Sequence, residues 1–171
     1  RFDPTTETFT AYRNDPSDIT SLNLDLVRAL FLDGDRTLWI GTFGGGLDRF
    51  DLGQAKAADT QNAIFTHFMH DPNNPHSLSD DNVFSIYRDT QDQLWIGTLQ
   101  GGLNQYDQTS GGFRQQQEIA KPAGTFEAES VYKVVEAAGM VWFGSSNGVY
   151  TKDLQAKHFY NLVHDSNEPN S

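Results

Sequence analysis

Short stretches rich in β-branched and aromatic residues recur along the chain, separated by turn-forming Gly, Asp, Asn and Pro. Four such stretches follow one another before the cycle starts again, and each has the length and composition of a β-strand. No segment shows the period of about 3.6 residues that marks an amphipathic helix. The pattern predicts an all-β protein. In the first cycle the predicted strands are Val27–Leu32, Thr37–Thr42, Gly46–Asp51 and Ile64–His70.

A tryptophan-centred strand marks each cycle. Leu-Trp-Ile-Gly-Thr occurs at 38–42 and 94–98, and Val-Trp-Phe-Gly-Ser follows at 141–145, so the tryptophans are 56 and then 47 residues apart. A four-stranded unit of about 40–50 residues is the spacing of a β-propeller blade. The other predicted strands are Val83–Arg88, Gln93–Thr98, Gly102–Asp107 and Gly112–Gln117 in the second cycle, and Val131–Glu136, Met140–Ser145, Gly148–Lys152 and Lys157–Val163 in the third.

The predicted fold class is therefore a partial β-propeller of about three four-stranded antiparallel blades plus half a blade, in one domain over residues 1–171. Arg1–Asp3 and Thr8–Arg13 match only the third and fourth strands of a unit, which predicts an outer half-blade at 1–13. Because the chain opens inside a repeat, we interpret it as a piece of a longer protein. The full blades are predicted at 27–70, 83–118 and 131–163.

The repeated tryptophans and glycines are the predicted structural core. Both faces of a propeller blade pack against neighbouring blades, so the inner strands need large apolar side chains, and a glycine permits close approach of the backbone. The predicted core residues are Trp39, Trp95, Trp142, Gly41, Gly97 and Gly144.

The composition excludes several classes of binding partner and of cysteine-based chemistry. The chain has 12 Lys and Arg against 23 Asp and Glu, a formal net charge of −11, and this field repels nucleic acid and anionic membranes. There is no cysteine, which excludes disulfides, thiol nucleophiles and cysteine-based zinc sites. No apolar run approaches the roughly 20 residues of a membrane helix.

The string Leu-Trp-Ile-Gly-Thr-x-x-Gly-Gly-Leu-x-x-(Phe/Tyr)-Asp, flanked by Asp-Pro-x-x-x-x-Ser-Leu and Val-x-x-(Ile/Leu), resembles the two-component regulator propeller repeat. The resemblance covers nearly all of the chain. The third unit departs from it, because the turn Gly144–Gly148 is one residue shorter and Ala120–Ser130 replaces the Asp-Pro loop. Arg36 and Asp92 stand where the repeat usually carries a turn glycine.

The resemblance implies a periplasmic sensor region, usually followed by a β-sandwich, a membrane helix and a cytoplasmic histidine kinase or diguanylate cyclase. In several relatives the signal is a carbohydrate fragment. The implied role of this segment is to bind an extracellular ligand and relay the signal. The segment itself is not expected to be an enzyme or to hold a cofactor or metal.

Candidate ligand-binding residues follow from propeller topology. Loops that enter a blade usually share a face with the turns between its second and third strands, and that face often binds ligands near the channel. Here the entering loops are Asp15–Asp25, Asp71–Asn82 and Ala120–Ser130. An aromatic side chain there could stack on a sugar, and amides or carboxylates could bond its hydroxyls. The candidates are Phe43, His76, Asp81, Asn82, Gln100 and Asn147.

Other interpretations of the same residues stay open. The glycines at 44–46 lack the Lys-Ser/Thr and helix of a phosphate loop, so a β-turn is favoured. Asp80, Asp81 and Asn82 carry oxygens that Ca²⁺ accepts, but their spacing is that of no EF-hand. The alternatives to a sensor are a lyase- or hydrolase-type propeller enzyme and a protein-interaction scaffold. Open apolar end faces also predict self-association of the chain.

Overall fold

The structure is a computed structural model that describes residues 1–53, 63–115, 128–155 and 158–162. Its described part contains strands and turns and no helix, and therefore no helix with the length and hydrophobicity to cross a bilayer. A hairpin pairs β1 (Phe2–Asp3) with β2 (Thr8–Phe9). The first sheet consists of β3 (Val27–Asp33), β4 (Thr37–Thr42), β5 (Leu47–Asp51) and β6 (Phe65–Phe68).

Two further sheets repeat this arrangement. The second consists of β7 (Val83–Arg88), β8 (Leu94–Thr98), β9 (Leu103–Asp107) and β10 (Gly112–Gln115). The third consists of β11 (Val131–Ala137), β12 (Met140–Ser145), β13 (Gly148–Asp153) and β14 (Phe159–Leu162).

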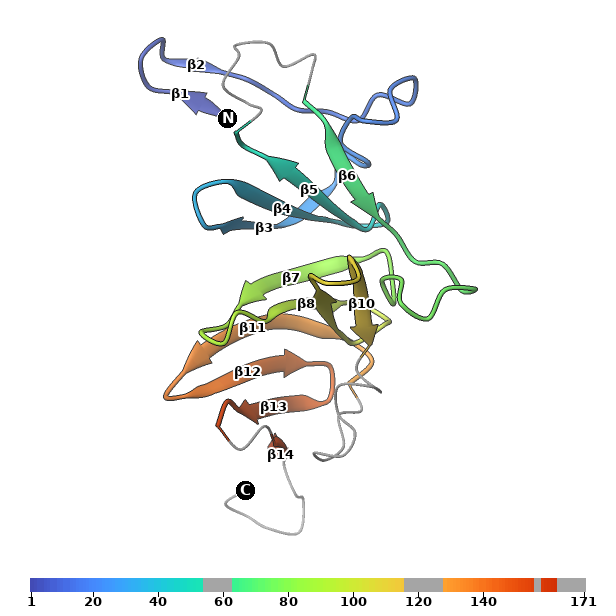
Figure 1. Cartoon of the computed structure of the whole chain (residues 1–171), viewed down its shortest axis with the longest axis vertical. Helices are drawn as coiled ribbons and strands as arrows, with labels where there is room; N and C mark the ends of the chain where they lie inside the picture. The colour runs from blue at the N-terminus through green and yellow to red at the C-terminus, as the bar shows by residue number, and fades with distance from the viewer. Residues whose placement is uncertain (54–62, 116–127, 156–157, 163–171) are drawn as a thin grey trace.

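Each sheet is an antiparallel meander in which consecutive strands pair. The three sheets lie one after another along the molecule, with β3, β7 and β11 next to one another (Figure 1). This arrangement confirms the predicted fold class of three four-stranded blades and a half-blade hairpin. The observed strands match the predicted ones to within two residues at their described ends, except that β2 ends at Phe9 and not at the predicted Arg13. The predicted positions 116–118, 120–127, 157 and 163 lie outside the described residues.

Buried side chains fill the spaces between the sheets. The cluster between the first and second sheets includes Trp39, Leu47, Ile86, Leu94 and Phe113. The loop that enters the second sheet adds Leu78, the last residue of the Asp-Pro…Ser-Leu motif, which is fully buried. The motif thus supplies a core residue as well as a turn.

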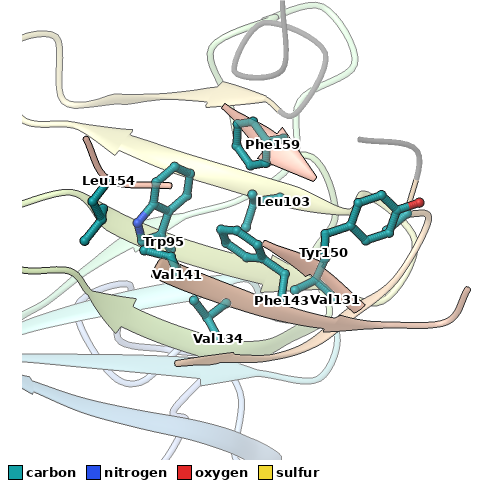
Figure 2. Close-up of a cluster of buried hydrophobic side chains, with 10 residues drawn as sticks. Trp95, Leu103, Val131, Val134, Val141, Phe143, Tyr150, Leu154 and Phe159 are labelled. Atoms are coloured by element: carbon teal, nitrogen blue, oxygen red, sulfur yellow. The ribbon is translucent and has the colours of Figure 1, made fainter. Parts of the chain in front are cut away.

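The second and third sheets enclose a matching cluster, shown in Figure 2. Trp95 lies at its centre, against Phe143 of the third sheet at a ring-centroid distance of 5.5 Å. Phe143 in turn lies 5.9 Å from Phe159. Each of the first two tryptophans therefore points toward the sheet that follows its own.

The first two repeat glycines permit the sheets to approach. A Cβ placed on Gly41 would lie 2.6 Å from a methyl carbon of Val83, and one on Gly97 would lie 2.6 Å from the carbonyl oxygen of Val131. Both contacts are with the first strand of the next sheet. A side chain at either position would separate neighbouring sheets.

The third anchor differs from the prediction. Trp142 is only partly buried, and its indole N–H donates to the carbonyl oxygen of Ala137 at 3.2 Å. A Cβ on Gly144 would meet nothing closer than Lys133, 3.9 Å away. Both residues lie on the side of the third sheet against which no further sheet packs within the described residues. The core role predicted for Trp142 and Gly144 is therefore not seen.

Charged side chains join the outer turns of successive sheets. Arg88 at the end of β7 donates two hydrogen bonds to Asp33 in the first sheet, at 2.7 and 2.5 Å. Burial alone would raise the pKa of Asp33, but the hydrogen bonds from Arg88 and Trp39 hold that pKa below its usual value. Glu136 of the third sheet likewise accepts two bonds from Thr90. The Arg88–Asp33 ion pair and the Thr90–Glu136 hydrogen bonds thus connect neighbouring sheets at the same end, near the turns between their first and second strands.

Apolar side chains are exposed on the outer parts of the third sheet, among them Val135, Val149 and Leu162. Self-association of the chain, expected from its open end faces, stays a prediction.

Candidate functional site

The loops predicted to form the ligand-binding face come together at one end of the first two sheets. The backbone N–H groups of Gly44 and Gly46, in the turn after β4, donate to the carbonyl oxygen of Asp81 at 3.1 and 2.9 Å. Phe43 and Asn82 form an isolated β-bridge, and the N–H of Leu99 donates to the carbonyl oxygen of Asn82 at 3.0 Å. The loop entering the second sheet is thereby bonded to turns of both sheets. We call this region the loop face.

Most polar groups of the entering loop serve its own structure. The Asp80 carboxylate accepts from the Asn82 side-chain amide at 2.9 Å and from the backbone N–H of Gln100 at 2.8 Å. The Asp81 carboxylate accepts from the backbone N–H of His70 at 2.7 Å. Asp81 and Asn82 are therefore primarily loop-bracing residues. Gln100 keeps an exposed side chain on the loop face.

An aromatic row runs across the loop face. Phe43, half-buried, meets Phe84 edge-to-face at 6.1 Å, and Phe84 meets Tyr132 in the same way at 5.9 Å. The guanidinium of Arg28 lies over the Phe43 ring, 5.5 Å from its centroid. These four side chains come from the first strands of all three sheets and from one turn. We refer to Phe43, Phe84 and Tyr132 as the aromatic row.

A repeated β-bulge explains the geometry. The register of the first strand shifts at the same place in every sheet, between Val27 and Ala29, between Val83 and Ser85, and between Val131 and Lys133. A bulge leaves one residue unpaired and turns its side chain away from the regular alternation. The residues skipped by the shift are Arg28, Phe84 and Tyr132.

Phe84, Tyr132 and Arg28 were not among the sequence-predicted candidates. Each directly follows the valine of the Val-x-x-(Ile/Leu) pattern. The one signal in the sequence is that this position carries an arginine or an aromatic residue. The alternation of a strand would turn these residues toward a neighbouring sheet. Only the bulge directs them onto a shared surface.

Two predicted candidates lie elsewhere. The carbonyl oxygen of His76 accepts from the backbone N–H of Phe113 at 2.8 Å, so His76 lies beside the outermost strand β10, with its side chain exposed. It borders a hollow of about 450 Å³ that also includes His67 and Asp71. Asn147 donates to the Tyr150 hydroxyl at 3.1 Å and shapes the turn before β13. The structure brings together Phe43, Asp81, Asn82 and Gln100 and separates them from His76.

No group of three or more His, Asp or Glu side chains arranged to hold a metal occurs among the residues that the structure describes. The Asp80–Asn82 oxygens considered for Ca²⁺ accept hydrogen bonds from neighbouring N–H groups, which is the behaviour of a turn.

A buried carboxylate lies directly below the loop face in the first sheet. Asp48 is fully buried, its Oδ1 is 2.5 Å from Nδ1 of His67, and its Oδ2 accepts from the backbone N–H of Asn23 at 3.0 Å. The other ring nitrogen of His67 is 2.9 Å from the carbonyl oxygen of Ile19. The Asp48–His67 pair thus fastens the loop that enters the first sheet.

Both ring nitrogens of His67 face oxygen atoms, whereas a neutral imidazole carries one N–H. The pair satisfies both contacts only while it holds a further proton, on the ring or on the Asp48 carboxyl. Burial raises the pKa of Asp48, against the opposing effect of the hydrogen bonds from His67 and Asn23. In the second sheet the equivalent pair is Asn104 and Gln115, which cannot ionise.

Replacing Asp48 with Asn should remove a pH dependence of stability. A raised folded-state pKa means that the contribution of Asp48 is fully present below its ordinary value of 3.8 and is lost as pH rises through the folded pKa. The free energy of unfolding of the wild type, relative to Asp48→Asn, should therefore fall as the pH is raised from below 3.8 toward neutrality. Urea denaturation at stepped pH measures this difference.

The converse change is the matched control. Asn104→Asp places an ionisable group at the equivalent buried position, beside Gln115, and should introduce a pH dependence of the same sign. A difference between wild type and Asp48→Asn that stays constant over this pH range would show that Asp48 keeps its ordinary pKa in the fold.

Two segments match the family described as two-component regulator propeller, residues 21–44 and 77–100. Each match begins in the loop entering a sheet and ends in the turn after its tryptophan strand, so both cover the same part of successive repeats. Among curated proteins, Histidine kinase P4 of Formosa agariphila is 32% identical over 72 residues, which is 42% of this chain and 5% of the kinase.

Solved structures share the fold. The extracellular domain of the hybrid two-component system BT3049 from B. thetaiotaomicron superposes with a TM-score of 0.72 at 22% identity, over 92% of this chain and 21% of that one. The corresponding domain of BT4673 gives 0.56 at 27% identity, over 76% and 17%. PorZ, a surface component of the type-IX secretion system of Porphyromonas gingivalis, gives 0.65 at 12% identity, over 98% and 24%.

This chain spans about one-twentieth of the curated kinase and about a fifth of these structures. The two-component structures are named as extracellular domains of signalling proteins, and the prediction that this segment is a propeller module and not an enzyme agrees with those names. The Leu-Trp-Ile-Gly-Thr strands and the Ser-Leu loops lie inside the two matched segments. Two successive segments of the chain therefore match the two-component regulator propeller repeat, the resemblance that the sequence pattern predicted.

Proposed function

We propose that this segment is part of the extracytoplasmic sensor region of a bacterial two-component protein, that its loop face binds an extracellular saccharide, and that binding is relayed to a cytoplasmic kinase or cyclase. The proposal places the segment in the periplasm. It is supported by the repeat matches and by the extracellular two-component domains that share the fold.

The aromatic row carries the proposal for the binding site. Its three rings form a continuous apolar strip across three sheets, and Tyr132, at 43% exposure, adds a hydroxyl within reach of solvent. Aromatic side chains offer flat apolar area at little cost in conformational entropy, and a phenol can also donate or accept a hydrogen bond. The exposed amide of Gln100 adds a further polar group to the loop face. A sugar ring, with an apolar face and a polar edge, fits this combination.

Position in the fold supports the relay. The row is made by the first strands of the sheets, which lie next to one another, and each is bonded to the loop face at one end and leads to the turns joined by Arg88 and Glu136 at the other. A ligand that bridges the rings would therefore bias how neighbouring blades pack.

A thermal-shift screen of the purified protein with neutral and acidic oligosaccharides tests the binding site. At least one saccharide should raise the melting temperature, and Phe84→Leu or Tyr132→Leu should weaken its binding about tenfold, since aromatic contacts of this kind contribute about 1–3 kcal/mol.

The matched control is Tyr160→Leu, because Tyr160 has the same 43% exposure but lies on the outermost strand β14. This variant should bind as the wild type does. A panel without any saccharide that binds, or binding that survives both row variants unchanged, would contradict the proposal.

A further inference from the structure

Arg28 differs from the other members of its repeat position. The position carries Phe84 and Tyr132 in the second and third sheets but a guanidinium in the first. Arg28 is exposed and stacks on Phe43 at the end of the aromatic row. A cation that continues a row of rings changes the ligand chemistry that the row can recognise.

The carboxylates near the loop face already have partners. Asp25 pairs with Arg13 at 3.8 Å and accepts from the backbone N–H of Asn14 at 2.7 Å. Asp80 and Asp81 accept the backbone N–H groups of Gln100 and His70, respectively, as described above. Within the described residues, no carboxylate forms an ion pair with Arg28. Its guanidinium is therefore available to an acceptor from outside the chain.

We propose that the loop face selects an acidic saccharide, with its sugar rings against Phe84 and Tyr132 and its oxyanion on the Arg28 guanidinium. This inference rests on the proposed function and specifies its ligand. The planar fork of an arginine donates two parallel hydrogen bonds to a carboxylate or to a sulfate, and the position of the Arg28 guanidinium over the Phe43 ring places that fork at the end of the aromatic row.

The net charge of −11 does not oppose this recognition at close range. Exposed charges are screened beyond about 8 Å at physiological ionic strength, so the ligand responds chiefly to the groups within that distance. The negative net charge also explains why an arginine is needed for binding an anion, because the chain has few cationic side chains.

Isothermal titration with three probes tests the inference: a galacturonic acid trimer, a sulfated neocarrabiose and a neutral galactose trimer. The trimer bearing carboxylates, the probe bearing sulfate, or both should bind about tenfold or more tightly than the neutral trimer. The two acidic probes separate a carboxylate ligand from a sulfate ligand.

Variants assign the preference to its residue. Arg28→Gln should abolish the preference for the acidic probe and leave binding of the neutral trimer within about twofold. Arg36→Gln, at an arginine whose side chain is 77% exposed in a different turn, should leave the preference unchanged. Melting curves verify that both variants are folded.

The outcomes distinguish the inference from the function on which it rests. Equal binding of acidic and neutral probes through Phe84 and Tyr132 would overturn the acidic selectivity and keep the saccharide site. A preference that persists in Arg28→Gln would also overturn it. Failure of all three probes to bind would count against both proposals.

Discussion

Replacing Trp95 with Ala is expected to destabilise the protein by about 3–5 kcal/mol, a large share of the total of about 5–15 kcal/mol typical of a domain. Trp95 is fully buried between the second and third sheets, with Phe143 on one side and the Lys152 ammonium 4.7 Å from its ring. Alanine would leave a cavity that sheets on both sides cannot easily close (Figure 2). Chemical denaturation measures the loss.

A hydrogen bond adds to this loss. The Trp95 indole N–H donates to Oδ2 of Asp89 at 2.8 Å, and Asp89 is only 4% exposed. Trp95→Phe keeps most of the ring but removes the donor, and should cost about 1–3 kcal/mol for the unsatisfied carboxylate oxygen. The difference between the two variants separates packing from hydrogen bonding.

Trp142→Ala is the matched control within the same repeat position. Trp142 is partly exposed, so its truncation should cost about 1 kcal/mol. Equal losses of stability for Trp95→Ala and Trp142→Ala would contradict the packing of Trp95 between the second and third sheets.

Gly97→Ala should destabilise the protein by about 2–3 kcal/mol. Its Cβ would lie 2.4 Å from the Ser85 hydroxyl and 2.6 Å from the carbonyl oxygen of Val131, and the backbone of the next sheet cannot move aside as the end of a flexible side chain can. The second and third sheets would have to separate, with loss of contact throughout the cluster between them. Thermal and urea denaturation both report this change.

The comparison with Gly144→Ala isolates the cause. Gly144 follows its tryptophan in the same way as Gly97, but nothing lies closer to its Cβ position than 3.9 Å. Alanine there should change stability by less than about 0.5 kcal/mol. If both substitutions cost the same, the glycines would be required by strand conformation and not by the approach of the next sheet.

The local pattern was sufficient to predict the strands and their grouping. Composition and turn residues mark strand ends, and the turns between the first and second strands of the sheets contain residues with positive φ, 61° at Gly34, 66° at Asp92 and 75° at Gly139. Arg36 can stand where the repeat usually carries a turn glycine because Gly34, two residues earlier, takes the left-handed conformation in the same turn.

The site depends on contacts that no local pattern contains. The bulge that exposes Phe84 changes register by one residue without changing composition, so the sequence still reads as a regular strand. The Arg88–Asp33 pair joins residues 55 positions apart, and the Asp48–His67 pair depends on the loop at Ile19. Phe43 was predictable because it lies in a turn whose place in a blade is fixed.

The repeat glycines and tryptophans give the array a direction. The first and second sheets each present an indole and a bare backbone to the next sheet, which receives them on a different surface that includes Val83 or Val131. Each repeat unit carries both surfaces of the interface between neighbouring sheets. Whole units can therefore be gained or lost without a change in the residues of that interface. A copy of the second unit inserted after the second sheet would present surfaces complementary to those of the second and third sheets.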